Sequence, residues 1–229
     1  MGATIGTRRR RTHNARPEPL VHATSGWFCL CAEVEIRRSF AQRYLFIVSM
    51  HWADTPIHFI DFEGSRASGI LEFGVATLHH GVIAATHTRL CRPIGRITEE
   101  DTAVHGLCEA DLQGENLFKD EWEYFTRLRE SGPFAAHFSQ AENHLIKSVW
   151  PYPRAVPDHA RPGRTTTEWG PWIDTGRLYP QAFPEQRDTK LAQLVVAGGW
   201  QAELDAVAGQ HCPAERRHYH AALYDALAG

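Results

Sequence analysis

The stretch HFIDFEGS, residues 58–65, decides how the rest of the chain is interpreted. Its first half is apolar and aromatic, which favours a β-strand, and side chains on a strand alternate between its two faces. Asp61 and Glu63 therefore share one face, while Phe62 points to the other. Two carboxylates this close repel each other, and partial burial makes their ionisation costlier. The pair is either two surface acids where a strand runs out into a loop, or two ligands of one bound cation.

Bulk composition indicates a globular protein with a sizeable core. The 229 residues fit one good-sized domain, or a domain with a tail, and the hydrophobic fraction of 43% and the charged fraction of 22% are ordinary for that class. The five cysteines contain no CxxC pair, which suggests reduced thiols in a cytoplasmic protein rather than a disulfide framework. No apolar run approaches the ~20 residues that cross a membrane, so we expect no membrane span.

Charge is unevenly divided along the chain. Eight arginines and three glutamates give residues 1–50 a net charge of +5, while residues 51–229, with 16 basic and 24 acidic residues, carry −8. An acidic main region argues against broad, passive binding to nucleic acid, which usually leaves a basic surface. It is compatible with an enzyme whose acidic residues hold a divalent metal.

The N-terminal region is expected to be an extension of the folded part. RRRR at residues 8–11 is followed by prolines and small polar residues, a composition typical of disorder. We therefore expect residues 1–55 to form a largely disordered extension and residues 56–229 to form the folded domain. Because charge and periodicity change near Met50, one hypothesis is that the natural protein starts there. The intact mass of protein from its native source tests this, and a full-length mass would exclude it.

From residue 56 onward, strand and helix patterns are clear. Strands are predicted at residues 57–62, 71–78, 82–90, 134–138 and 172–179. Helices are predicted at 97–106, 117–131, 141–150, 190–200 and 213–229, with a long loop at 151–171. A meander of strands followed by alternating strands and helices predicts an α/β fold, with a mixed sheet flanked by helices.

His220 and Asp225 stand out on the predicted last helix. They are five residues apart, which turns a helix by about 500° and leaves the side chains roughly 140° apart. They can border one cleft only if His220 approaches from a loop or from the first turn. Ala222 would let the helix lie close to the sheet. Considered alone, His220 is better explained as a surface histidine in the polar run RRHYH, and Asp225 is an ordinary acid on a helix surface.

A third acidic position lies between these two regions. His137 ends a predicted strand, and Glu142 begins the next helix. An acid there would lie over the end of the sheet, where the active sites of open α/β folds gather. The alternative is that Glu142 complements the dipole of its helix.

The order of these motifs resembles the DEDDh 3′–5′ exonucleases, the branch of the RNase H-like superfamily that includes RNase T and the bacterial polymerase proofreading subunit. The resemblance covers about residues 56–229 and departs from the family at the second motif, where HNxxFD is usual. The matching segments are Asp61-Phe62-Glu63, His137-Phe138-Ser139-Gln140-Ala141-Glu142, His220-Ala221-Ala222-Leu223-Tyr224-Asp225, ITEEDTAVHGL at 97–107 and WIDTGRLY at 172–179. Glu142 thus replaces an aspartate, which keeps the charge and adds a methylene.

The resemblance implies a central mixed five-stranded sheet flanked by helices, and a site with two divalent cations, Mg²⁺ or Mn²⁺. Asp61, Glu63 and Asp225 would hold one ion, and Asp61 with Glu142 would help to hold the second. His220 would deprotonate the attacking water, a role that suits a side chain titrating near neutral pH. The expected reaction is hydrolysis of single-stranded DNA or RNA from its 3′ end to 5′-mononucleotides.

Two further residues and several partners are implied by the same resemblance. Ser65 and His105 are candidates for contacting the terminal nucleotide. Members of the family often form homodimers, so a homodimer is one expectation, and association with a polymerase and a role in DNA repair stay open.

Two alternatives remain beside the exonuclease. The first is a catalytically impaired RNase H-like protein that binds nucleic acid or a protein partner, an idea motivated by Glu142. The second is a different RNase H-like metal nuclease. End-labelled substrates separate it from an exonuclease, because an internal cut leaves long fragments.

Overall fold

The computed structural model describes residues 54–229, so the expected extension and the hypothesis of a start at Met50 lie outside the described residues. A five-stranded sheet organises this part of the chain, in the order β3-β2-β1-β4-β7. The first three strands form an antiparallel meander, and the last two join it in parallel, so the sheet is mixed. The predicted fold class is confirmed. The strands are β1 (Ile57–Ser65), β2 (Gly69–His79), β3 (Val82–Leu90), β4 (Phe134–Ala136) and β7 (Trp172–Asp174).

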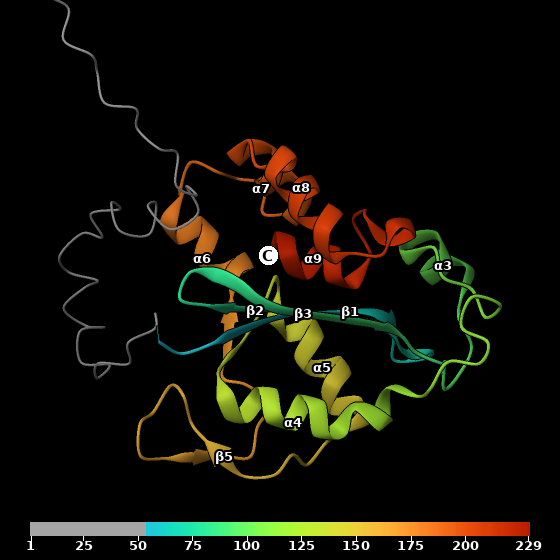
Figure 1. Ribbon diagram of the computed structural model, residues 1–229, viewed down its shortest axis with the longest axis horizontal. Coiled ribbons are helices and arrows are strands. Elements are labelled where there is room, and N and C mark those ends of the chain that lie inside the picture. The colour runs from blue at the N-terminus through green and yellow to red at the C-terminus, as the bar shows by residue number, and fades with distance from the viewer. Residues whose placement is uncertain (1–53) are drawn as a thin grey trace, which may run out of the picture. The chain divides into compact units, whose positions relative to one another are not determined.

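Helices cover both faces of the sheet. Figure 1 shows the sheet between two helical layers, with α7, α8 and α9 on one side and α4 and α5 on the other. No helix between residues 54 and 229 combines the length and apolar character needed to span a membrane. The helices are α3 (Glu99–His105), α4 (Trp122–Ser131), α5 (Ser139–Val149), α6 (Thr175–Ala182), α7 (Leu191–Gly198), α8 (Gln201–His211) and α9 (Ala222–Ala228), with 3₁₀ turns η1 (Phe118–Glu121) and η2 (Ala214–Arg216).

The alternation of β1 divides its side chains between two apolar clusters. Ile60 and Phe62 are buried with Phe125 of α4 and with other aromatic side chains on the α4 and α5 side. Phe59 packs instead against the cluster around Leu223 of α9. Because Asp61 and Glu63 alternate with Phe62, they lie on the face that α9 covers. The sheet therefore places two carboxylates directly beneath the last helix.

Several predicted elements differ from the structure in more than a shifted end. The expected helix at 213–229 is a 3₁₀ turn, a loop and the shorter α9. The strand at 172–179 ends at Asp174, whose side chain accepts a hydrogen bond from the Arg177 amide and begins α6. The loop at 151–171 contains a small hairpin of β5 (Val156–Pro157) and β6 (Thr165–Thr166).

The last of the helices was mispredicted because tertiary contacts override its helical spacing. Arg217 donates from Nε to the Cys212 carbonyl at 3.1 Å and from Nη2 to the Gly209 carbonyl at 3.0 Å. His220 then adopts a left-handed conformation, with φ of 63°. Hydrogen bonds between an arginine side chain and distant backbone carbonyls cannot be predicted from the spacing of apolar residues. The helix α9 therefore begins only at Ala222.

Gly74 of β2 sets how closely α9 approaches the sheet. A methyl group there would lie 2.2 Å from the Leu223 nitrogen and 2.3 Å from the Ala222 carbonyl carbon. We expect Gly74→Ala to destabilise the fold by about 1–3 kcal/mol, the usual cost of overpacking, and to lower the thermal unfolding midpoint. The control is Gly209→Ala in α8. A methyl group there would have no atom from outside its own helix turn within 4 Å, and alanine is favoured over glycine in a helix. A Gly74→Ala midpoint equal to that of the unchanged protein would contradict this packing.

Candidate active site

The two central strands place acidic and small residues on the face beneath α9. Asp61 lies opposite Gly74, and Glu63 lies opposite Glu72. Directly opposed residues of antiparallel strands share a face, so the three acids and the glycine form one patch. The register shifts between Glu63 and Gly64, and such bulges often accompany active sites, where they redirect side chains.

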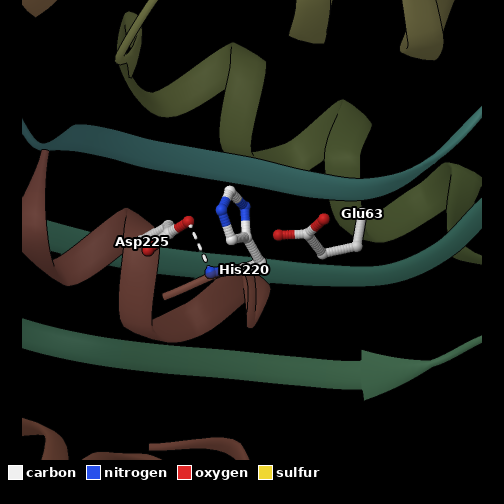
Figure 2. Close-up of side chains that lie close together, drawn as sticks. All are labelled: Glu63, His220 and Asp225. Carbon is white, nitrogen blue, oxygen red and sulfur yellow. Dashed lines mark hydrogen bonds between the residues drawn. The ribbon is translucent and has the colours of Figure 1, made fainter. Parts of the chain in front are cut away.

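His220 and Asp225 meet this patch from the start of α9. Asp225 is in the first turn of the helix, and one of its carboxylate oxygens accepts a hydrogen bond from the His220 backbone N–H at 3.0 Å. Glu63, His220 and Asp225 each offer one ligand atom, and these atoms all lie within 4.8 Å of one another. Figure 2 shows the three side chains close together, Glu63 from β1, His220 from the segment before α9 and Asp225 from α9 itself. The expected separation of about 140° does not apply, because His220 precedes the helix.

Glu142 reaches the same region from the other side of the sheet. It lies in the first turn of α5, which begins at Ser139, two residues earlier than predicted. Its side chain is 5% exposed, and its charge acts on that of Asp61. A glutamate that only complemented the helix dipole would stay in solvent, whereas Glu142 is buried beside another acid.

Burial and neighbouring acids raise the pKa values of four carboxyl groups here, those of Asp61, Glu63, Glu142 and Asp225. Burial, followed by the charges of Asp225 and Glu72, raises the pKa of Glu63 to about 8. Burial likewise raises the pKa of Glu142 to about 8 and that of Asp225 to about 7. The pKa of Asp61 is raised well above its ordinary value, first by burial and then by its acidic neighbours. Without a cation, the folded chain must keep these groups partly protonated at neutral pH.

The donor set fits hard divalent cations. One carboxylate oxygen of Glu142 and one of Asp225 are buried and have no hydrogen-bond partner. Buried acceptors of this kind are costly unless something pairs with them. Carboxylate oxygens are the ligands that Mg²⁺ and Mn²⁺ prefer. Glu63 and Asp225 belong to the group of atoms within 4.8 Å, whereas Asp61 and Glu142 lie outside that group, and the unpaired buried oxygens are those of Glu142 and Asp225.

Ser65 is the last residue of β1, and His105 is the last residue of α3. The Ser65 hydroxyl donates to a carboxylate oxygen of Asp101 at 3.1 Å, which ties the hairpin to α3. His105 is buried, and its Nδ1 accepts a hydrogen bond from the Leu107 amide at 3.0 Å. Burial lowers the pKa of His105, and its Nε2 is buried without a partner. Contact of either residue with a nucleotide stays a prediction.

His137 and Asp174 hold neighbouring segments in place. Nε2 of His137 donates to the Thr189 carbonyl at 2.7 Å, and its Nδ1 lies 3.1 Å from the Thr175 hydroxyl. Asp174 caps α6 and accepts a hydrogen bond from the Ser139 hydroxyl at 2.9 Å. The hydrogen bonds of His137 and Asp174 thus join α5, α6 and the segment that follows α6.

Two residues of the site were missed from the sequence. Glu72 is 2% exposed, lies opposite Glu63 and forms an ion pair with Arg216 at 2.5 Å. The sequence did hold a signal for Glu72, which is a charged residue inside the apolar run ILEFGV. Side chains alternate along a strand, so Glu72 shares one face with Gly74 and Ala76. Arg216 stands in the polar run ERRHYH, and no spacing there distinguishes it from Arg217.

Solved structures share the fold of this chain, although no protein-family model and no curated protein matches the sequence. Exonuclease X in complex with 5′-overhanging duplex DNA is 20% identical, with a TM-score of 0.55 over 75% of this chain and 85% of that one. The nuclease domain of 3′hExo, a DEDDh family member bound to rAMP, is 16% identical, with a TM-score of 0.50 over 77% and 88%. The chain has the fold of the DEDDh exonucleases.

The DEDDh fold is also embedded in larger proteins. E. coli exonuclease I, in complex with a dT13 oligonucleotide, is 11% identical, with a TM-score of 0.56 over 76% of this chain. The match spans 39% of that exonuclease. At these identities the likeness concerns the fold, so the roles of individual residues have to be argued from their own geometry.

Proposed function

We propose that the chain is a metal-dependent 3′–5′ exonuclease that hydrolyses single-stranded DNA or RNA to 5′-mononucleotides. The observation that carries this proposal is the convergence of Glu63, His220 and Asp225 within 4.8 Å, on a sheet face that also holds Asp61. A carboxylate cluster with a histidine at its edge supplies both metal ligands and a proton acceptor. The DEDDh fold supports the same reaction class by analogy.

Asp61, Glu63 and Asp225 would hold one divalent ion, and Asp61 with Glu142 would help to hold a second. When bound, such ions polarise the scissile phosphate and stabilise the charge that develops on its oxygens. The chain itself contributes the cluster's position at the end of β1 and the first turns of α5 and α9. Their raised pKa values mean that protons must leave as cations bind.

His220 would accept the proton of the attacking water. Its side chain is exposed, so water and substrate have access to the ring, while its backbone N–H is anchored on Asp225. An imidazole held next to carboxylates can take up a proton, and a positioned base contributes about 10²–10⁴-fold to rate. The water's oxygen would form the new bond to phosphorus as the bond to the 3′ oxygen of the preceding nucleotide breaks.

The same proposal includes several finer points. Single-stranded nucleic acid with a free 3′ end is the expected partner. DNA repair is one process in which such an activity is used. The cytoplasm is the expected location, since the three cysteines between residues 54 and 229 are free thiols. Sedimentation of the purified protein tests for a homodimer, and co-purification tests for an associated polymerase.

A nuclease assay with 5′-labelled single strands of DNA and RNA tests the proposal. With Mg²⁺ or Mn²⁺ we expect a ladder that shortens one nucleotide at a time from the 3′ end, and no ladder with chelator. His220→Gln is expected to lower the rate by roughly 10²–10⁴-fold, because it removes the proton acceptor. His144→Gln, an exposed histidine on α5, is the matched control and should leave the rate unchanged.

Other outcomes of this assay favour the alternatives. Long internal fragments would identify a different metal nuclease. Binding without cleavage by well-folded protein would favour the catalytically impaired protein, an alternative that rests on the presence of Glu142 where an aspartate is usual.

A further inference from the structure

A buried ion pair lies directly behind the candidate active site. Glu72 is 2% exposed and Arg216 is 8% exposed. Arg216 donates from Nε to one carboxylate oxygen of Glu72 at 3.2 Å and from Nη2 to the other at 2.5 Å. This two-pronged geometry fixes the plane of the guanidinium relative to β2.

The same two side chains also hold the backbone on both sides of Ala221, directly after His220. Nη2 of Arg216 donates to the His220 carbonyl at 3.0 Å, and Nη1 donates to the His105 carbonyl at 2.9 Å. On the other side, the Ala222 amide donates to a carboxylate oxygen of Glu72 at 3.2 Å. The peptide groups before and after Ala221 are thus both tied to one ion pair.

The segment held by these contacts includes a residue in an unfavourable backbone conformation, His220. Its φ of 63° lies in the left-handed region, which a residue with a Cβ adopts at an energetic cost and keeps only when its surroundings enforce it. Without such support, the His220 backbone would be expected to relax to a negative φ. A buried ion pair is a poor source of net stability, because desolvation offsets the attraction between the charges.

We propose that Glu72 and Arg216 are positioning residues that hold His220 in its left-handed conformation and so aim its ring at Glu63 and Asp225. This inference rests on the proposed function, in which His220 is the proton acceptor. The competing explanation is that Arg216 only offsets the repulsion between Glu63 and Glu72, which face each other across β1 and β2. The two explanations predict different activities for a variant in which apolar side chains replace the pair.

The test compares Glu72→Met/Arg216→Met with the unchanged protein. Replacing a buried ion pair by apolar residues of similar size commonly preserves stability, so we expect a retained unfolding midpoint. If the pair positions His220, kcat falls by about 10²-fold or more while KM changes less than about threefold. Unchanged kcat in this folded variant would overturn the proposal.

Arg216→Lys is a second variant. Lysine keeps the charge but lacks the guanidinium group, which donates to Glu72, His105 and His220 at once, so kcat should fall as well.

A double-mutant cycle with His220→Gln separates positioning from general damage. If Arg216 acts through His220, adding Arg216→Lys to His220→Gln costs less than about threefold in kcat, because the group it positions is already gone. A full additional loss in the double variant would contradict the proposal.

A measurement that needs no activity keeps this inference distinct from the proposed function. Amide hydrogen exchange of residues 217–224 should be at least about tenfold faster in Glu72→Met/Arg216→Met, with exchange in β1 and β2 unchanged. An inactive unchanged protein would overturn the nuclease assignment, and its exchange data would still decide whether the pair holds this segment. Equal exchange in the two proteins would overturn the positioning role.

Discussion

Asp61→Asn should abolish nuclease activity and, at the same time, make the metal-free protein more stable. The loss of activity is expected to be roughly a thousandfold or more, since Asp61 is the one carboxylate assigned to both ions, whose charge stabilisation supplies several kcal/mol. The gain in stability comes from relieving repulsion in the cluster. Burial and the charges of Glu142, Asp225, Glu63 and Glu72 all disfavour an ionised Asp61. Asparagine has nearly the same shape and no charge to remove from water.

The stability gain can be measured by thermal unfolding in the presence of a chelator. At pH 7.5 we expect Asp61→Asn to be more stable by about 1–2 kcal/mol, which raises the midpoint by roughly 2–8 °C in a protein of this size. At pH 4 the difference should be much smaller, because the carboxyl group is then protonated in the folded chain and about half protonated in the unfolded chain. The control is Asp120→Asn, an exposed aspartate on η1, which should change neither the midpoint nor the activity.

Opposite signs for these two effects distinguish a metal site from a structural network. If Asp61 held the fold together through hydrogen bonds, removing its charge would lower the unfolding midpoint. A less stable Asp61→Asn protein, or one that keeps its activity, would therefore contradict the assignment.

Divalent metal should reverse the pH dependence of stability. The folded chain has pKa values of about 8 for Glu63 and Glu142 and about 7 for Asp225, all above the ordinary carboxyl range. The folded state therefore binds more protons than the unfolded state between about pH 4 and pH 8, and linkage makes stability fall as pH rises through this window. In chelator, the cluster's contribution is most favourable below about pH 4 and is lost by about pH 8.

Mn²⁺ or Mg²⁺ should compensate for this loss, because a cation replaces the bound protons. At a metal concentration one hundred times Kd, binding would add about 2.7 kcal/mol of stability, and the gain should be larger at pH 8 than at pH 5, where protons compete. Unfolding midpoints across pH, with metal and with chelator, measure both effects. Stability that rises with pH in chelator, or a midpoint that metal leaves unchanged at pH 8, would argue against a carboxylate metal site.

The sequence pattern predicted the strands and helices whose boundaries depend on nearby residues alone. The strand patterns at 57–62, 71–78 and 82–90 predicted the meander of β1 to β3, and the helix predicted at 97–106 is α3, capped by Thr98, which accepts a hydrogen bond from the Asp101 amide. The segment before α9 was mispredicted because arginine side chains, not periodicity, decide its backbone. The helix predicted at 190–200 ends at Gly198, because Gly199 follows it in the left-handed conformation.

The candidate site was predictable where its residues share a strand or a short motif. Asp61 and Glu63 had to lie on one face, and the structure adds the reason they are close to Asp225, namely the approach of α9 over Gly74. Glu72 and Arg216 are 144 residues apart, and only the folded chain brings them together. The position of His220 depends on that pair, so its geometry could not be derived from spacing along a helix.

Hydrolysis of a single-stranded oligonucleotide in ¹⁸O-labelled water tests the central claim most directly. Mass spectrometry of the products should show nucleoside 5′-monophosphates that carry one ¹⁸O in the phosphate, formed with Mn²⁺ and absent both with chelator and with Asp61→Asn. Substrate that stays intact, products without ¹⁸O, or fragments from internal cleavage would contradict a metal-dependent exonuclease in which water attacks phosphorus at this cluster.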